Sequence, residues 1–200
     1  MSDLYKTITG VGQGLVREKM SRFISFAIPA ESSDEARQYI KEYQNKYHDA
    51  RHVCWAYVLG PDRQTWQCND NGEPSGTAGK PILGQINSFG LTNILIVVVR
   101  YFGGIKLGTS GLISAYREAA REAIENSVIE ERHDCRNVNI RFPYLAMNDV
   151  MKLCKTFGLV PQNQQFDNSC SMQVSVRLDH LQHLLSAIAD IDGASADTPD

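Results

Sequence analysis

Two glycine-rich loops hold most of the residues whose types suit ligand binding. The first spans residues 69–81 and contains Lys80, and the second spans residues 100–111 and contains Arg100 and Lys106. Each loop leads into a segment with helical spacing of apolar residues, and the free N–H groups at a helix N-terminus attract anions. Neither loop has the Gly-Lys-Ser/Thr ending of a phosphate-binding Walker loop. Glycines in loops commonly serve turns, and the loops are at the same time a candidate anion site.

Two carboxylates in the first loop suit acid–base chemistry. Asp70 and Glu73 lie close together in sequence, and a positioned pair of carboxylates can donate and accept protons. Asp70 is also followed by Asn71-Gly72, which is a favourable turn sequence. The pair is thus the candidate catalytic set of a hydrolase, and a polar turn is the alternative.

The second loop alternates cations with aromatic residues. Arg100-Tyr101-Phe102 is followed by Lys106. Cations contact phosphates and aromatic rings stack on bases, so these residue types together are typical of a contact with RNA or single strands. The alternative is that both rings pack beneath the loop, because aromatic side chains gain most from burial.

Metal binding and nucleophilic catalysis have weaker support. His52 and Cys54 face one side of a predicted strand, with Cys68 nearby in the next strand, but the usual close-spaced zinc ligand pairs are missing from the sequence. Ser75 and Ser110 lie in the glycine-rich loops, and neither belongs to a G-x-S-x-G motif. We therefore expect no metal and no cofactor.

Composition indicates a globular cytoplasmic protein. The chain has 200 residues, is 42% hydrophobic, and carries a formal net charge of −3 with a pI near 6.0. This charge argues against a broad basic surface and leaves room for a local one. Every apolar run is shorter than the roughly 20 residues that span a bilayer, so we expect no membrane association. The N-terminal residues lack a signal-peptide core, and the five cysteines lack the spacing of a disulfide framework.

The candidate residues are positioned by strands with clear patterns. Residues 94–99 are apolar at every position, which is typical of a strand at the centre of a sheet covered on both faces. That strand delivers Arg100 at its end. Further strands are expected at residues 23–28, 52–59 and 65–68, the first of them as one arm of a hairpin.

Helix starts are predicted from capping residues. Ser32 and Glu35 have the capping-box spacing. The helix after the first glycine-rich loop is expected to begin with Thr77 as its cap. The long helix after the second loop is expected to be capped by Thr109 or Ser110.

A polar segment at residues 130–134 is interpreted as a domain boundary. The predicted domains are residues 1–131 and residues 132–200. The second domain has the element order β-α-β-β-α, most of a ferredoxin-like unit, and the small polar tail at residues 192–200 is expected to fray.

Three blocks of sequence carry a resemblance to a known family. They are Arg51 to Tyr57 (RHVCWAY), Asn71 to Leu83 (NGEPSGTAGKPIL) and Val97 to Gly108 (VVVRYFGGIKLG). Blocks of this kind in this order resemble the signature of the IMPACT family, whose bacterial members are often called YigZ-like proteins. The resemblance covers roughly residues 10–129, and the C-terminal unit resembles the extra domain of the bacterial members.

The resemblance implies an α+β fold with two domains. The N-terminal domain is expected to have a ribosomal protein S5 domain 2-like fold, a sheet backed by helices. The C-terminal domain is expected to be ferredoxin-like, similar to domains of elongation factor G. Both likenesses direct attention to RNA and the ribosome, although a fold by itself does not define a function.

The resemblance also implies a role in translation. The eukaryotic members are translational regulators that compete for the scaffold of a starvation-responsive kinase, and this chain is expected to lack their N-terminal partner-binding domain. We predict a non-catalytic protein that binds RNA, the ribosome or a translation-associated protein, with its oligomeric state left open. The alternatives are a hydrolase that uses Asp70 and Glu73 on a phosphate- or peptide-containing substrate, and a pure protein-interaction module. The implied binding surface comprises His52, Asp70, Glu73, Ser75, Thr77, Lys80, Arg100, Tyr101, Gly103, Gly104 and Lys106.

Overall fold

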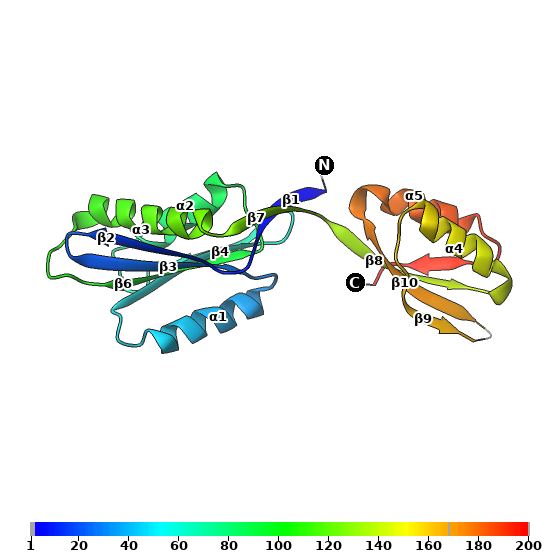
Figure 1. Ribbon diagram of the computed structural model, residues 1–200, viewed down its shortest axis with the longest axis horizontal. Coiled ribbons are helices and arrows are strands. Elements are labelled where there is room, and N and C mark those ends of the chain that lie inside the picture. The colour runs from blue at the N-terminus through cyan, green and yellow to red at the C-terminus, as the bar shows by residue number, and fades with distance from the viewer. Residues whose placement is uncertain (1–2, 168, 200) are drawn as a thin grey trace. The chain divides into compact units, whose positions relative to one another are not determined.

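The computed structural model describes residues 3–167 and 169–199, which divide into two compact units (Figure 1). Residues Tyr5–Arg132 form the first unit. The described residues from His133 onward form the second unit, together with Asp3 and Leu4. Across the described residues, no helix is long and apolar enough to cross a membrane.

The first unit is built on a five-stranded antiparallel sheet. Its strands run in the order β2 (Gly12–Glu18), β3 (Ser21–Pro29), β6 (Ile94–Tyr101), β4 (His52–Leu59) and β5 (Thr65–Asn69). The prediction of a central strand is confirmed, because β6 is the middle strand and is buried from Ile94 to Arg100. Apolar side chains on both of its faces require cover on both sides.

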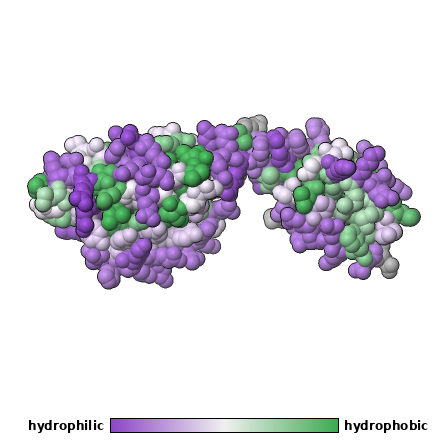
Figure 2. All heavy atoms as spheres, in the orientation of Figure 1, coloured by the Kyte–Doolittle hydropathy of each residue, from purple (hydrophilic) through white to green (hydrophobic). Residues whose placement is uncertain are grey.

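Helices supply that cover (Figure 1). Helix α1 (Ser33–Lys46) lies on one face of the sheet, and α2 (Gly79–Ser88) and α3 (Gly108–Glu125) lie on the other. Two hydrophobic cores result, one on each face. The solvent side of α1, along the lower edge of the first unit, is mainly hydrophilic in Figure 2.

The capping predictions are partly confirmed. The Glu35 N–H donates to Ser32 Oγ at 3.2 Å, as the capping box requires. Thr77 does not cap α2, since its hydroxyl donates to the Pro74 carbonyl at 2.6 Å and Ala78 occupies the N-cap position. Leu107 occupies the N-cap position of α3, so the prediction of Thr109 or Ser110 as its cap is also wrong.

The segment expected to be a polar boundary is a strand. Strand β7 (Val128–His133) pairs with β1 (Leu4–Thr9) in a two-stranded sheet. This pairing could not be predicted from the sequence, because the segment is rich in charged residues and lacks an alternating apolar pattern. A two-stranded sheet can satisfy its backbone hydrogen-bonding groups without such a pattern.

The second unit has the expected ferredoxin-like order. Its antiparallel sheet runs β11 (Ser195–Asp197), β8 (Cys135–Phe142), β10 (Cys170–Arg177), β9 (Gln162–Phe166). Helices α4 (Met147–Thr156) and α5 (Leu181–Ala189) cover one face (Figure 1), and short 3-10 turns precede each at Tyr144–Ala146 and Leu178–His180. The fold-class prediction is confirmed. The expectation of a fraying tail is wrong for Ser195–Asp197, which pairs with β8, and residue 200 lies outside the described residues.

Candidate functional site

Both glycine-rich loops meet at one pocket of about 610 Å³, here called the loop pocket. The antiparallel register of β4 and β6 sets His52 directly opposite Arg100, at the start of the second loop. His52 Nδ1 also lies 2.8 Å from the Asn71 carbonyl of the first loop, so the two loops lie side by side. The loop pocket is lined by Arg51, His52, Gly72, Glu73, Pro74, Arg100, Phe102, Lys106, Leu107, Gly108, Thr109 and Leu112.

A buried ion pair forms part of the pocket wall. Arg100 is only 5% exposed, and its Nη1 donates to Glu73 Oε1 at 2.6 Å. The Tyr116 hydroxyl donates to the same oxygen at 2.8 Å. Burial raises the pKa of Tyr116 far above its ordinary value, so the phenol remains a donor at all physiological pH values. This group of three side chains, the Arg100–Glu73–Tyr116 cluster, fastens the first loop to β6 and α3.

The cluster continues to a cysteine that does not suit nucleophilic chemistry. Cys54 Sγ lies 3.3 Å from the Tyr116 hydroxyl and 3.0 Å from the Asp70 carbonyl. Burial raises the pKa of Cys54 to about 12, so its thiol stays protonated at neutral pH. A thiolate is the reactive form of cysteine, and Cys54 therefore acts here as a buried packing residue.

Two aromatic rings contact the Arg100 guanidinium. Its central carbon, Cζ, lies 5.5 Å from the ring centroid of Phe23 and 5.6 Å from that of Phe102, within cation–π range. Arg100 Nε is buried and has no hydrogen-bond partner among the residues that the structure describes. Phe102 is 46% exposed, so this ring lies at the rim of the loop pocket and can also contact a ligand.

Asp70 caps the N-terminus of α2, although it lies several residues earlier in the chain. Its carboxylate accepts three backbone N–H hydrogen bonds, from Gly76 (2.8 Å), Ala78 (3.0 Å) and Gly79 (2.8 Å). Burial raises the pKa of Asp70, but these hydrogen bonds outweigh it and the pKa lies below its ordinary value. Asp70 thus fills the role that we predicted for Thr77. With Glu73 held in the buried cluster, the geometry does not assemble the two carboxylates for acid–base work.

Replacing Asp70 with asparagine is expected to weaken folding in a pH-dependent way. A carboxylate whose pKa is lowered by folding stabilises the protein above its unfolded-state pKa, and this contribution is lost as pH falls through the folded-state value. At neutral pH the free energy of unfolding of the wild type should therefore exceed that of Asp70→Asn by about 1 kcal/mol, because hydrogen bonds to a charged acceptor are stronger than those to a neutral amide. The difference should shrink below about pH 4, near the ordinary pKa of an aspartate.

Urea unfolding at several pH values measures this difference. The matched control is Asp62→Asn, because exposed Asp62 accepts one backbone hydrogen bond, from Gln64 at 3.1 Å. A gap between wild type and Asp70→Asn that is constant from neutral to acidic pH would contradict the capping role.

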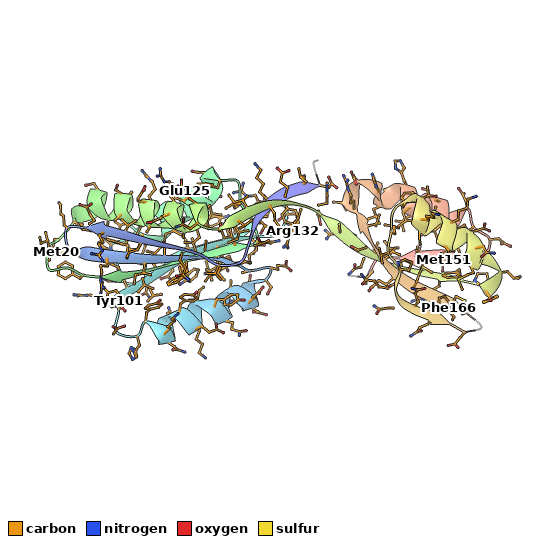
Figure 3. All side chains as sticks on the ribbon, in the orientation of Figure 1. Met20, Tyr101, Glu125, Arg132, Met151 and Phe166 are labelled. Carbon is orange, nitrogen blue, oxygen red and sulfur yellow. The ribbon has the colours of Figure 1, made fainter. Side chains whose placement is uncertain are left out.

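The structure separates two of the expected binding residues from the loop pocket. Tyr101 follows Arg100 in the strand and therefore points to the opposite face, on the side of α1 (Figure 3). Its hydroxyl donates to Asp49 Oδ1 at 2.8 Å. Exposed Lys80 borders a different hollow of about 450 Å³, together with Arg117. The expectation that both would share one surface with Arg100 is therefore wrong.

The sequence comparisons identify a family. Residues 19–124, just over half of the chain, match the model of the Impact N-terminal domain. This chain belongs to the IMPACT family.

Relatives of the IMPACT family extend the match through most of the chain. It is 38% identical to "IMPACT family member YvyE" of Bacillus subtilis over 146 residues, covering 73% of this chain and 67% of the relative. It is 35% identical to "IMPACT family member YigZ" of Escherichia coli over 137 residues, covering 68% and 67%. It is also 31% identical to mouse "Protein IMPACT" over 98 residues, covering 46% and 30%. A crystal structure titled as that of a hypothetical protein matches with a TM-score of 0.75 and 26% identity, covering 100% of this chain and 99% of that one.

The glycines of the second loop in this IMPACT domain have backbone roles. A Cβ on Gly103 would lie 2.1 Å from the backbone carbon of Met20, which marks the turn between β2 and β3 (Figure 3). Gly104 has φ +91°, a conformation that side chains disfavour. These two glycines therefore shape the loop and do not line the pocket. In the first loop, Ser75 is exposed and Thr77 is buried.

Sequence reasoning missed several pocket residues. Exposed Arg51 and the first turn of α3 line the loop pocket. Phe102, which the sequence offered as a stacking ring, lines it as well, although the implied binding surface did not include it. Arg51 adjoins His52, and this sequence neighbour could have suggested it.

His52 Nδ1 lies 2.8 Å from the Asn71 carbonyl, and because a carbonyl only accepts, Nδ1 carries the proton.

The loop pocket is locally positive. Three basic side chains, from Arg51, Arg100 and Lys106, face one carboxylate from Glu73, which leaves a formal surplus of +2 with His52 neutral. The N-terminus of the 18-residue α3 adds the positive end of its dipole, and its first turn holds no acidic residue. The arrangement suits a phosphate group.

Proposed function

We propose that this protein is a cytoplasmic, non-catalytic regulator of translation that binds RNA, free or within the ribosome, through the loop pocket. The observation that carries the proposal is the convergence of Arg51, Arg100, Lys106 and the α3 N-terminus on one pocket. Phosphate contacts of this kind supply most of the sequence-independent affinity for nucleic acid. The association with translation rests on membership of the IMPACT family.

Each part of the pocket has a role in this proposal. Arg51 and Lys106 are exposed and meet phosphate oxygens directly. Backbone N–H groups at Gly108 and Thr109 donate to the same anion. The exposed Phe102 ring offers a stacking surface for a base, which tolerates any sequence.

The carboxylate geometry favours binding over hydrolysis. Asp70 is committed to the N-terminus of α2, and Glu73 is 8% exposed and paired with Arg100. A general acid or base must reach the proton that it transfers. Neither carboxylate is free to do so in this arrangement, so we propose a binding protein.

Amide chemical shifts measured during an RNA titration test the proposal. Isotope-labelled full-length protein is titrated at low salt with a short single-stranded RNA. The largest shifts are expected at Gly108 and Thr109 and in the loop at Gly72, because these residues line the pocket. Amides of α1 serve as the internal control, since α1 covers the other face of the sheet. Shifts confined to α1 or to the second unit, or no shifts at all, would overturn the proposal.

A further inference from the structure

We infer that the loop pocket recognises a terminal phosphate monoester of RNA in preference to the phosphodiesters within the strand. This inference rests on the proposed function, because it specifies which phosphate of the RNA the site takes. It is carried by three features of the pocket: a recessed cation, a surplus of positive charge confined to one place, and an exposed ring at the rim.

The recessed cation is Arg100. The residue is 5% exposed, yet it lines a pocket of about 610 Å³. A phosphodiester inside a strand carries a nucleoside on each side, and both must stay outside such a recess. A terminal phosphate has one ester bond, so its three non-ester oxygens can enter the pocket while the nucleoside stays outside. The buried Nε of Arg100, which has no hydrogen-bond partner among the described residues, thus favours the end of a strand.

The quantity of charge agrees with a dianion. A phosphate monoester carries about −1.5 to −2 charge at pH 7 with three acceptor oxygens, whereas a diester carries a single charge. The loop pocket holds a formal surplus of +2 after Glu73 is set against one of its three cations. The α3 N-terminus adds backbone donors at the same place. Because these donors converge on one pocket, they match one highly charged group.

The rim of the pocket provides a place for the terminal base. Phe102 contacts the Arg100 guanidinium with its ring and is 46% exposed. A base joined to the bound phosphate through one sugar would lie near this rim and could stack on the ring. The pocket volume falls in the range of about 300–1,000 Å³ that small ligands occupy, which includes a nucleotide.

Binding of matched RNAs tests the inference. Fluorescence anisotropy is measured with one internally labelled single-stranded sequence carrying a 5′-phosphate, a 3′-phosphate, or hydroxyls at both ends. A hydroxyl-ended RNA that is one nucleotide longer controls for added charge, because it gains an internal phosphate. One of the two phosphorylated ends is expected to bind at least about tenfold more tightly than both hydroxyl-ended RNAs.

Variants assign that preference to the pocket. In Arg51→Ala/Lys106→Ala the advantage of the phosphorylated end should disappear, and both replaced residues are exposed, so the fold is preserved. The matched control Arg37→Ala/Lys41→Ala removes two exposed cations from α1 and should keep the advantage.

The outcomes separate the inference from the proposed function. Equal affinity for all four RNAs, weakened in Arg51→Ala/Lys106→Ala, would overturn the terminal preference and leave RNA binding at the pocket in place. A terminal preference that survives in Arg51→Ala/Lys106→Ala would also overturn the inference. Absence of binding to every RNA at low salt would overturn both.

Discussion

Replacing Glu73 with alanine is expected to lower the free energy of unfolding by about 3–5 kcal/mol, the cost of leaving a buried charge unpaired. Arg100 would keep its guanidinium between Phe23 and Phe102 without its carboxylate partner. The Tyr116 hydroxyl would also lose its acceptor. Arginine does not deprotonate in proteins, so the charge cannot be relieved by titration. Urea unfolding at neutral pH measures the loss.

A double variant separates the charge effect from the loss of packing. Glu73→Leu/Arg100→Met removes both charges and keeps apolar volume, and such replacements of buried ion pairs are often neutral or stabilising. The double variant should therefore be more stable than Glu73→Ala. A loss below about 1 kcal/mol in Glu73→Ala, the value of an exposed pair, would show that the cluster is solvated.

Removing Arg51 and Lys106 together is expected to weaken RNA binding about 10- to 100-fold at low salt, equivalent to about 1.4–2.8 kcal/mol. Both side chains are exposed at the loop pocket, where they can contact phosphate directly. Arg100 is unsuitable for this test because its replacement also unpairs buried Glu73. Equilibrium binding to a single-stranded RNA measures the change.

The control for this prediction is Arg37→Ala/Lys41→Ala. It removes the same formal charge from exposed positions of α1, on the other face of the sheet. Because the loop pocket is intact, RNA affinity should change by less than about threefold, within the range of long-range charge effects under screening. Equal weakening in both double variants would indicate non-specific attraction.

The fold is largely predictable from the sequence. Uninterrupted apolar residues from Ile94 to Val99 require a central strand, and the structure places β6 there. Ser32 and Glu35 form the predicted cap because both partners are local in sequence. Strand β11, by contrast, forms through backbone pairing with β8 and through contacts of Asp197 with Asn139 and Arg141, which its small polar residues do not reveal.

The candidate site is only partly predictable, because its residues depend on long-range geometry. Thr77 has the right type and position to cap α2, yet Asp70 reaches the helix N-terminus from eight and nine residues earlier in the chain and takes that role. Tyr101 and Phe102 are equivalent in the sequence pattern. Strand alternation sends Tyr101 to the side of α1, while Phe102 follows the strand and reaches the pocket rim.

The salt dependence of RNA affinity, compared between the wild type and Arg51→Ala/Lys106→Ala, tests the central claim most directly. If the loop pocket contacts phosphate, affinity should fall steeply as salt rises, and the double variant, which lacks two cations, should show a slope shallower by about 1.4 on a log–log scale. Equal slopes for the two proteins, or an affinity that is indifferent to salt, would contradict a phosphate-binding pocket.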